Sequence, residues 1–375
     1  MKKRTAFLSL FIMVIMIFTV GCAKKQEESS VIPEPSVKSS SEVALSSSEP
    51  VVSSSVVPSS EPVEPMYSSV SPTTGKGYET EQEFYPIMVT IENASGARPQ
   101  TGLNKADIIY EFPVESTITR FLCIFNDNRP KEVGPVRSAR YYFLYTQKEW
   151  DCIYEHFGGA REDESISVYN AKYNWIRVRI DGLKGKYSPF YWRDNSRKAP
   201  HNVYSDLTYV KEQYPDFTSK RTYFWKHSDS PSTSDVEAKS IHIPFASQKK
   251  HNVEFFYDAK KGQYTRYENG ELFKSIEMDD KGKKSQEAVV TNNIIIQYVP
   301  MDTTHTGKYY RRVINMMGSG KAEYFINGKY ITGKWERKTQ NDVTKYYDDK
   351  GQEIVLAVGT TWVAIQPTWY KVTFE

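Results

Sequence analysis

The chain has 375 residues and a formal net charge of +3, from 49 lysine and arginine residues against 46 aspartate and glutamate residues. This balance is too close to neutral to indicate nucleic-acid binding through bulk charge. Aromatic residues make up 14% of the chain, which is ample material for a core and for aromatic-lined surfaces.

The N-terminus has the layout of a signal peptide. A basic head (Lys2, Lys3, Arg4) precedes the apolar run "AFLSLFIMVIMIFTV", which ends in Gly21 and Cys22. The run is too short for a comfortable membrane span, and the alternative is a short anchor helix that is never cleaved. Gly21-Cys22 resembles a bacterial lipobox, which favours cleavage and a diacylglycerol on Cys22. We therefore predict a signal peptide at residues 1–21 and a lipid-anchored protein facing the extracytoplasmic side of the cell membrane.

Residues 22–80 are rich in serine, proline and glutamate and show no periodicity. Such a segment has too little apolar content to offset the entropy lost on ordering, so we expect a disordered tether. The tether would hold a globular body away from the membrane surface.

The remaining two cysteines, Cys123 in "RFLCIF" and Cys152 in "DCIYEHF", both stand in apolar surroundings. Two buried thiols that behave as small hydrophobes are favoured over a disulfide between them. Neither has a histidine at ligand spacing, so we predict no metal site and no cofactor.

Residues 81–230 predict a mixed α/β domain. Strands are expected in "YPIMVTIEN", on either side of Pro113 in "ADIIYEFPVESTITRFLCIFND", in "DCIYEHF" and in "WIRVRID". Helices are expected from a cap at Ser138 to Trp150, within "REDESISVYNAKYN", and from a cap at Ser205 to Pro215.

Residues 236–375 predict a second domain that is almost purely strand, after a linker in "KHSDSPSTSD". Asn269-Gly270 and Asn327-Gly328 are typical of tight hairpin turns. The predicted fold class is therefore α+β: a mixed α/β N-terminal domain followed by a mainly antiparallel β C-terminal domain.

Arg137 and Arg140 lie at the expected start of the helix that follows Gly134-Pro135. Positive side chains are unfavourable beside the positive end of a helix dipole, so a function is expected for them. One reading is a phosphate or carboxylate site with bidentate arginines. The other is a pair of ion pairs with acidic neighbours such as Glu132 or Asp107.

His156 ends its predicted strand just before Gly158-Gly159, which allows a close approach of the backbone to a ligand or to another chain segment. A strand-end histidine facing a cleft could be a general base, but a structural histidine is favoured.

The segment "SPFYWRDNSRKAPHNVYSD" is an expected loop that combines aromatic rings, cations and a histidine. Loops held by a scaffold often carry binding residues, and exported carbohydrate binders use such mixtures. The candidate ligand-binding residues here are Trp192, Arg193, Arg197 and His201. A solvated surface loop is the alternative.

The chain has no G-x-S-x-G, H-E-x-x-H, Walker or dinucleotide motif. If the protein is an enzyme, the candidates are His156 or His201 as base, with Glu92, Glu111 or Glu115 as partner acid.

Six segments together resemble the YerB-type bacterial lipoproteins: "RPQTGLNKADIIYEFPVESTITRF", "VGPVRSARYYF", "EHFGGA", "FYWRDNSRKAPHNVY", "GSGKAEYFINGKYITGKW" and "GTTWVAIQP". The resemblance covers essentially the whole chain after the tether. It implies a Gram-positive envelope lipoprotein with a mixed α/β part and a β-rich part, and no established activity. Ala160 stands where relatives commonly have serine, which argues against a serine nucleophile at that position.

Three hypotheses follow. The first is a lipoprotein that binds an anionic or glycan ligand of the cell envelope, such as a phosphate-bearing wall polymer, through basic residues of the N-terminal domain. The second is a hydrolase or transferase acting on wall polymers with a histidine and carboxylate pair. The third is a scaffold that contacts other envelope proteins.

Overall fold

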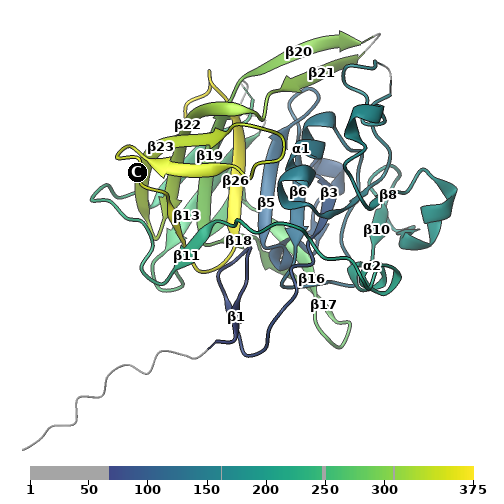
Figure 1. Ribbon diagram of the computed structural model, residues 1–375, viewed down its shortest axis with the longest axis horizontal. Helices are drawn as coiled ribbons and strands as arrows, with labels where there is room; N and C mark the ends of the chain where they lie inside the picture. Colours follow the sequence, from purple (N-terminus) through teal and green to yellow (C-terminus); the bar gives the residue numbers. More distant parts are fainter. Residues whose placement is uncertain (1–66, 162, 247–250, 307–308) are drawn as a thin grey trace, which may run out of the picture. The chain divides into compact units, whose positions relative to one another are not determined.

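The computed structural model describes residues 67–161, 163–246, 251–306 and 309–375 (Figure 1). The predicted signal peptide, Cys22 and most of the predicted tether lie outside these residues. The predicted α+β fold class is confirmed, because the described part is a mixed sheet with few helices and a separate antiparallel sheet.

The largest sheet has ten strands. In spatial order they are β24 (Lys345–Asp348), β23 (Lys329–Arg337), β22 (Gly318–Ile326), β19 (Asn293–Val299), β26 (Thr361–Pro367), β5 (Ile108–Pro113), β6 (Thr119–Phe125), β3 (Ile87–Glu92), β7 (Ile153–His156) and β8 (Arg179–Asp181). The first five come from the C-terminal half of the chain and the last five from the N-terminal half. They join where β26 runs parallel to β5, with Trp362 opposite Ile109. The two predicted parts share this sheet, and where the boundary between them falls stays a prediction.

The other strands form smaller sheets. The antiparallel sheet contains β15 (Glu271–Leu272), β14 (Gln263–Glu268), β13 (Asn252–Asp258), β12 (Ser240–Pro244) and β27 (Thr373–Phe374), with β18 (Val290–Thr291) beside β14. Shorter pairings join β17 (Lys284–Ala288), β16 (Lys274–Met278) and β4 (Gln100–Thr101); β20 (Met301–Thr306) and β21 (Tyr309–Ile314); β9 (Tyr191–Arg193) and β10 (Val203–Ser205); β11 (Lys226–Ser228) and β25 (Val355–Ala357); and β1 (Ser69–Val70) and β2 (Gly77–Tyr78).

Both faces of the central strands are buried. Along β5 and β6, Ile109 and Phe121 face one core cluster, whereas Ile108 and Leu122 face the other. The first cluster is shared with the antiparallel sheet and the second with helix α1 (Tyr141–Trp150), which lies over this part of the sheet in Figure 1. Burial on both sides explains why these strands read as continuous apolar runs.

The helix starts differ from the predictions. Helix α1 begins at Tyr141 after Arg140, and Ser138 donates instead to the carbonyl of Phe157 at 3.1 Å. Helix α2 (Leu207–Gln213) is capped by Asp206, whose carboxylate accepts from the amide of Thr208 at 2.8 Å. An aspartate accepts amide hydrogens at a helix start as well as serine does, and the predictions chose the wrong neighbour.

The predicted helix in "REDESISVYNAKYN" is also wrong. Among the described residues of this segment the helical part is the 3-10 turn η3 (Ala171–Tyr173). The Asp163 carboxylate accepts from the backbone amide of Ser165 at 2.7 Å, and Asn170 accepts from the amide of Lys172 at 2.9 Å. Aspartate and asparagine in such local bonds favour turns over helix. The remaining 3-10 turns are η1 (Ser95–Ala97), η2 (Leu103–Lys105) and η4 (Gly185–Phe190).

The folded body starts earlier than residue 81, the expected end of the tether. Thr73 and Thr74, between β1 and β2, are fully buried. The Thr73 hydroxyl donates to Asp107 at 2.8 Å and the Thr74 hydroxyl donates to Asp127 at 2.5 Å. Two threonines paired with distant carboxylates carry little local signal, so composition alone could not separate them from the tether.

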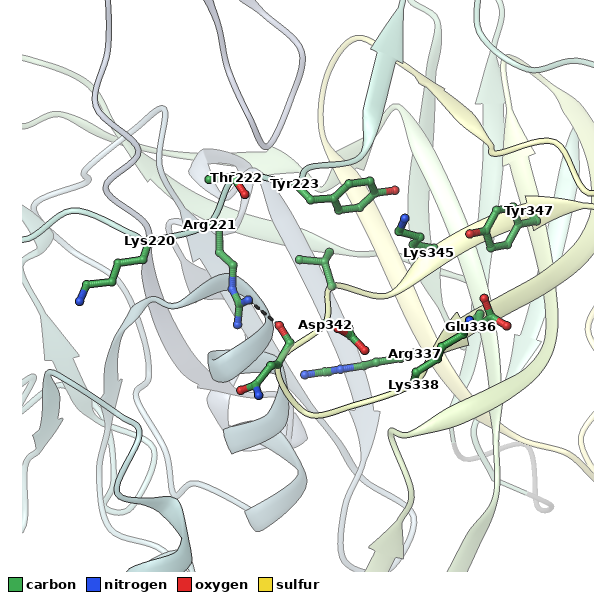
Figure 2. Close-up of a pocket in the computed structure, with 12 residues that line it drawn as sticks. Lys220, Arg221, Thr222, Tyr223, Glu336, Arg337, Lys338, Asp342, Lys345 and Tyr347 are labelled. Atoms are coloured by element: carbon green, nitrogen blue, oxygen red, sulfur yellow. Dashed lines mark hydrogen bonds between the residues drawn. The ribbon is translucent and has the colours of Figure 1, made fainter.

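The segment before the expected linker lies against the C-terminal half of the chain (Figure 2). The Arg221 guanidinium donates to the carbonyl of Asn341 at 2.5 Å, and the Trp225 indole donates to the carbonyl of Thr344 at 2.9 Å. Strand β11, inside the expected linker, then pairs with β25. Residues 221–228 are therefore fixed in place by the connection between β23 and β24 and by β25.

Candidate functional site

Glu92, the last residue of β3, holds two of the predicted binding residues. Its buried carboxylate lies 3.0 Å from the Nε of Arg137 through Oε1 and 2.7 Å from the Nδ1 of His201 through Oε2. The Glu92 side chain is 2% exposed, whereas those of Arg137 and His201 are 24% and 26% exposed. The Glu92 carboxylate is therefore buried beneath Arg137 and His201, and both of these side chains reach the solvent.

The backbone fixes this arrangement. Residues 135–137 run beside the end of β3, since the amide of Glu92 donates to the carbonyl of Pro135 at 2.9 Å and the amide of Arg137 donates to the carbonyl of Thr90 at 2.8 Å. Gly96 faces the imidazole, because a Cβ there would lie 3.1 Å from Cδ2 of His201. A larger residue at this position would push against the histidine.

Glu115, in the turn after β5, is shared by three guanidinium groups. Arg140 binds it in a bidentate manner, with Nε and Nη2 each 2.6 Å from a carboxylate oxygen. Arg311 of β21 donates to Oε1 at 2.6 Å, and Nη2 of Arg120 lies 3.7 Å from Oε2. Burial raises the pKa of the Glu115 carboxyl, but Arg140 and Arg120 outweigh it and hold that pKa well below the usual range.

Arg120 connects the two carboxylates. It lies opposite Glu92 in the pairing of β3 with β6, and its Nη1 donates to the carbonyl of Ser138 at 2.9 Å. Burial, together with the positive charge of Arg140, lowers the pKa of Arg120 to about 9. We call Arg120, Arg137 and Arg140, with Glu92 and Glu115, the arginine cluster. It has three guanidinium groups for two carboxylates, and a positive excess of this kind favours an anion.

The predicted pairing of arginines with carboxylates is therefore correct in kind, but the partners are different. Glu132 is held by Lys284 at 2.7 Å, and Asp107 accepts from Thr73 and from backbone amides. The arginines also lie outside the helix: Arg140 is the residue before its first turn, with an extended backbone, so the two do not share a helical face. The arginines therefore pair with carboxylates at the ends of neighbouring strands, those of Glu92 and Glu115, and not with the acidic residues that were predicted.

His156 is fully buried, with a hydrogen bond at each ring nitrogen. Its Nδ1 lies 2.8 Å from the carbonyl of Gly158, and the Nε of Arg179 lies 2.8 Å from Nε2. Burial and the charge of Arg179 lower the pKa of His156 to about 3. These contacts fit the structural reading, and we leave His156 out of the proposed site.

The glycine pair accommodates other chain segments. A Cβ on Gly158, whose φ is +76°, would lie 2.7 Å from the side chain of Leu183, and one on Gly159 would lie 2.3 Å from Val168. The glycine pair was predicted to allow close approach of the backbone either to a ligand or to another chain segment, and in the structure it is close to another chain segment.

The loop between β9 and β10 places its predicted residues in separate contacts. Trp192 is 39% exposed and stacks on Tyr204. Arg193 donates to the Asn202 side chain at 2.8 Å, and Arg197 donates to the carbonyls of Ala97 and Pro99 at 2.9 and 2.6 Å. Arg197 therefore stabilises the segment that contains Gly96. The loop between β9 and β10 contacts the arginine cluster through His201, which lies against Glu92.

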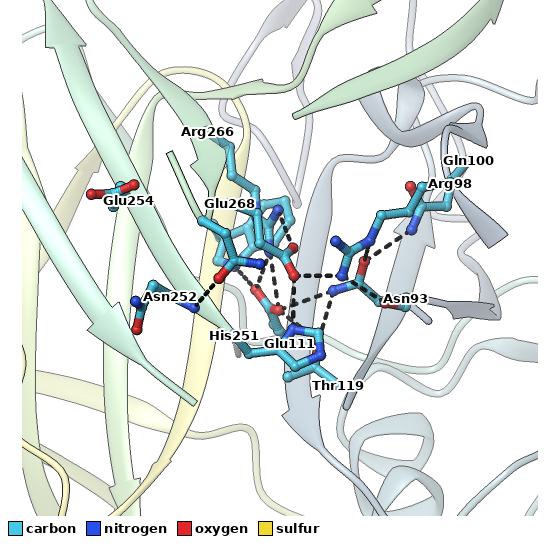
Figure 3. A network of polar contacts seen from close by, with 12 residues as sticks. Asn93, Arg98, Gln100, Glu111, Thr119, His251, Asn252, Glu254, Arg266 and Glu268 are labelled. Atoms are coloured by element: carbon cyan, nitrogen blue, oxygen red, sulfur yellow. Dashed lines mark hydrogen bonds and ion pairs between the residues drawn. The ribbon is translucent and has the colours of Figure 1, made fainter. Parts of the chain in front are cut away.

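Glu111 belongs to a different, buried network (Figure 3). It lies 3.2 Å from Nη2 of Arg266, and both side chains have no exposed surface. Arg266 also binds Glu268, whose other oxygen lies 2.7 Å from Nδ1 of His251, and Arg98 completes the set. Glu111 lies within β5, whereas Glu115 lies in the turn after this strand ends at Pro113.

Sequence reasoning missed Arg120 and Arg311. Arg120 follows Thr119 at the start of β6, where a single charge in an apolar run would have been a usable signal. Arg311 reaches Glu115 from a residue 196 positions away, and no local pattern indicates that contact.

In the described ranges no three histidine, cysteine, aspartate or glutamate residues gather as a metal site would require. The helices of these same ranges include none long and apolar enough to cross a membrane. Both Cys123 and Cys152 are buried free thiols, which confirms the favoured reading over a disulfide.

Comparison with known proteins places this geometry in a family. Residues 73–223 match the model "Protein of unknown function (DUF3048) N-terminal domain", and residues 241–363 match the corresponding C-terminal domain. The "Putative lipoprotein YerB" of Bacillus subtilis (strain 168) is 32% identical over 304 residues, which cover 78% of this chain and 85% of the relative. The crystal structure of YerB protein from Bacillus subtilis has a TM-score of 0.67 at 28% identity, over 82% of this chain and 99% of that one. The chain belongs to the YerB-like family and carries both the N- and the C-terminal domain of DUF3048.

Proposed function

We propose that this protein is a lipid-anchored extracytoplasmic binding protein that takes an anionic ligand of the cell envelope at the arginine cluster. The observation that carries the proposal is the charge imbalance: in the described part of the chain, the guanidinium groups of Arg120, Arg137 and Arg140 share the two carboxylates of Glu92 and Glu115.

The geometry gives each arginine a different part. Arg140 and Arg120 are nearly buried, with 8% and 5% of their side chains exposed, so they set the positive potential of the cluster from within. Arg137 is 24% exposed and is the guanidinium most able to contact a ligand directly. His201, at 26%, lies on the other oxygen of Glu92 and can donate or accept at its free edge.

A phosphate group suits this arrangement better than a neutral sugar. Guanidinium groups bind phosphate in bidentate fashion, and a positive site at the surface gathers anions from solution. A neutral glycan would have to gain its affinity from stacking, and Trp192 already stacks on Tyr204.

Anchoring would come from Cys22, which lies outside the described residues. The family relationship to a protein named as a lipoprotein supports it. Mass spectrometry of the protein expressed in a Gram-positive host should show a lipid on an N-terminal Cys22, and Cys22→Ser should carry none. A wild-type chain that still begins at Met1 would favour the uncleaved anchor helix.

The binding test is calorimetric titration of the full-length protein in detergent with a glycerol phosphate oligomer and, separately, with a neutral chitin oligomer. Arg137→Gln should weaken binding of the phosphate oligomer about tenfold, as expected for loss of one charge-assisted bidentate contact. Lys260→Gln, which removes an exposed charge elsewhere, is the matched control. Equal affinities for the Arg137→Gln and Lys260→Gln proteins would end the proposal, and tight binding of the neutral oligomer alone would shift it to a glycan site.

A hydrolase or transferase remains the second candidate, because a histidine and a carboxylate predicted as a pair do meet. The His201–Glu92 contact at 2.7 Å would hold the imidazole ring in a fixed orientation. In the described part of the chain no serine, threonine or cysteine side chain is hydrogen-bonded to His201, which points to an activated water. Hydrolysis of a wall-polymer fragment that is lost in His201→Gln and in Glu92→Gln would establish this function; no release by the wild-type protein would remove it.

A further inference from the structure

A hollow in the structure is lined by residues that lie far along the chain from the arginine cluster. It has a volume of about 430 Å³ and is formed where residues 220–223 lie against the connection between β23 and β24. This is within the range of small-ligand sites, which often form where two parts of a chain meet. Its lining includes Lys220, Arg221, Tyr223, Lys338, Lys345 and Tyr347.

The exposed part of the lining carries an excess of positive charge, whereas the buried arginine of the lining is neutralised by a carboxylate. Arg337, which has no exposed surface, is paired with the equally buried Glu149 at 3.0 Å, so this pair adds no net charge. Around it stand three exposed lysines and Arg221, against the acidic side chains of Glu336 and Asp342. Four cations over two anions leave a local excess of positive charge.

Arg221 is built into the wall. Its guanidinium donates to the carbonyl of Asn341, a bond drawn in Figure 2, and to the carbonyl of Lys148, and these two bonds fix its direction. Burial lowers the pKa of Arg221, and burial together with the charge of Arg221 lowers that of Lys148. A nearby anion would relieve the crowding of these like charges.

Tyr223 adds a polar group that the described residues leave unused. Its hydroxyl oxygen is buried and has no hydrogen-bond partner in the described ranges, and Nζ of Lys345 lies 4.6 Å from the centre of its ring. In Figure 2 the ring of Tyr223 lies beside Lys345, on the side of Tyr347. A buried hydroxyl without a partner costs stability, so a ligand that accepts its hydrogen bond would be favoured.

We propose that this hollow, which we call the basic pocket, binds a phosphate-bearing small molecule or the phosphorylated end of a polymer. Lysine ammonium groups act as mobile point charges that suit a multivalent phosphate, and Arg221 provides a fixed donor at the wall. The Tyr223 hydroxyl donates to one ligand oxygen. This site is separate from the proposed function of the arginine cluster and does not depend on it.

The test is calorimetric titration of the full-length protein in detergent, at low and at high salt, with inorganic pyrophosphate, glucose 1-phosphate and glucose. Use of the Arg137→Gln background lowers the contribution of the arginine cluster to the measured binding about tenfold, as argued above. We expect at least one phosphate probe to bind, with affinity that falls with salt, and glucose to give no heat of binding. Tighter binding of glucose 1-phosphate than of pyrophosphate would assign a sugar phosphate; the reverse would assign a compact polyphosphate group.

Two variants locate the site. Lys338→Gln with Lys345→Gln should weaken phosphate binding about tenfold or more, whereas Lys260→Gln with Lys371→Gln, which removes the same charge elsewhere, should leave it unchanged. Tyr223→Phe should weaken binding several-fold without lowering the melting temperature of the free protein, because the hydroxyl has no partner to lose. The proposal is overturned if neither phosphate probe binds at low salt, or if the two double variants behave alike.

Discussion

The chain carries two groups of arginines and carboxylates, and they differ in what surrounds them. In the network of Figure 3, Arg266 and Glu111 have no exposed surface, and Arg266 also lies over the ring of Phe273 at 3.9 Å. In the arginine cluster, Arg137 is a quarter exposed over its buried carboxylate. The comparison shows two roles for charged groups. A charge pair buried in the core stabilises the fold, whereas a partly exposed group of charges with an excess of positive charge is suited to bind an anionic ligand.

The carboxylates of the buried network respond to the same surroundings in opposite ways. Burial raises the pKa of Glu111, against the lowering effect of Arg266. For Glu268, burial is outweighed by Arg266 and by the hydrogen bond with His251, which bring its pKa to about 2. Arg266 therefore supports one carboxylate that is held ionised and one that burial pushes toward neutrality.

The largest expected effect comes from opening the buried network. Arg266→Gln would leave Glu111 and Glu268 without their shared cation inside the core, and we expect a loss of about 3–5 kcal/mol in the free energy of unfolding. Chemical denaturation of the variant and of Lys260→Gln would measure it. A loss below about 1 kcal/mol would mean that the network contributes little to the fold.

A buried carboxyl of β7, that of Glu155, should give a pH-dependent effect. Burial raises the pKa of Glu155 to about 8 from an ordinary value of 4.5, although Ser205 donates to it. The folded state therefore prefers the neutral acid. The contribution of Glu155 to the free energy of unfolding is fully present below about pH 4.5 and is lost as the pH rises through about 8.

Glu155→Gln stays neutral, so its stability relative to the wild type should rise between about pH 5 and pH 8 by up to about 1.4 kcal/mol per pH unit, and level off above that. Melting temperatures across this range would measure the change. A difference that is constant with pH would show that Glu155 titrates normally in the folded protein.

A smaller effect on stability is expected in the arginine cluster, which is partly exposed. Arg137→Gln should change the free energy of unfolding by less than about 1 kcal/mol, because its guanidinium is partly solvated and its ion pair is screened. Denaturation in parallel with Arg266→Gln would give the contrast directly. Equal losses for the two variants would remove the distinction between a closed and an open group.

The smallest expected effect concerns the thiols. Cys123 and Cys152 are buried and burial raises the pKa of each well above the usual range, so neither is a reactive thiolate. Native protein treated with a maleimide should remain unlabelled at both, and denatured protein should be labelled at both. Labelling of Cys123 in the native state would show that the sheet opens around β6.

Local chemistry made a good part of the fold predictable. Strands such as β3 and β6 are continuous apolar runs, and Asn327-Gly328 forms the expected two-residue turn, with φ of +50° and +73°. The cap of α2 was missed by one residue, because serine and aspartate both satisfy the free amides of a first turn. That of α1 was missed by two residues, because Arg140 precedes the helix without a side-chain cap.

The candidate site was predictable in its residue types and not in its pairings. Arg137, Arg140, Glu92, Glu115 and His201 were all singled out, and the structure brings them to the ends of β3, β5 and β6. The contacts that set their roles span long distances in sequence: 109 residues separate His201 from Glu92, and 155 separate Arg266 from Glu111. Without the pairing of β26 with β5, no local rule distinguishes Glu111, which has no exposed surface, from Glu115, whose side chain is 22% exposed.

The most direct test of the account is the ligand-induced change in melting temperature, measured side by side for wild type and Arg137→Gln with a saturating glycerol phosphate oligomer. Without ligand the two proteins should melt at nearly the same temperature. With ligand, the wild type should be stabilised by several degrees, as expected when a ligand binds the folded state alone, and Arg137→Gln should gain little. An equal gain in both proteins, or a large loss in the ligand-free variant, would contradict the assignment of a binding role to this arginine.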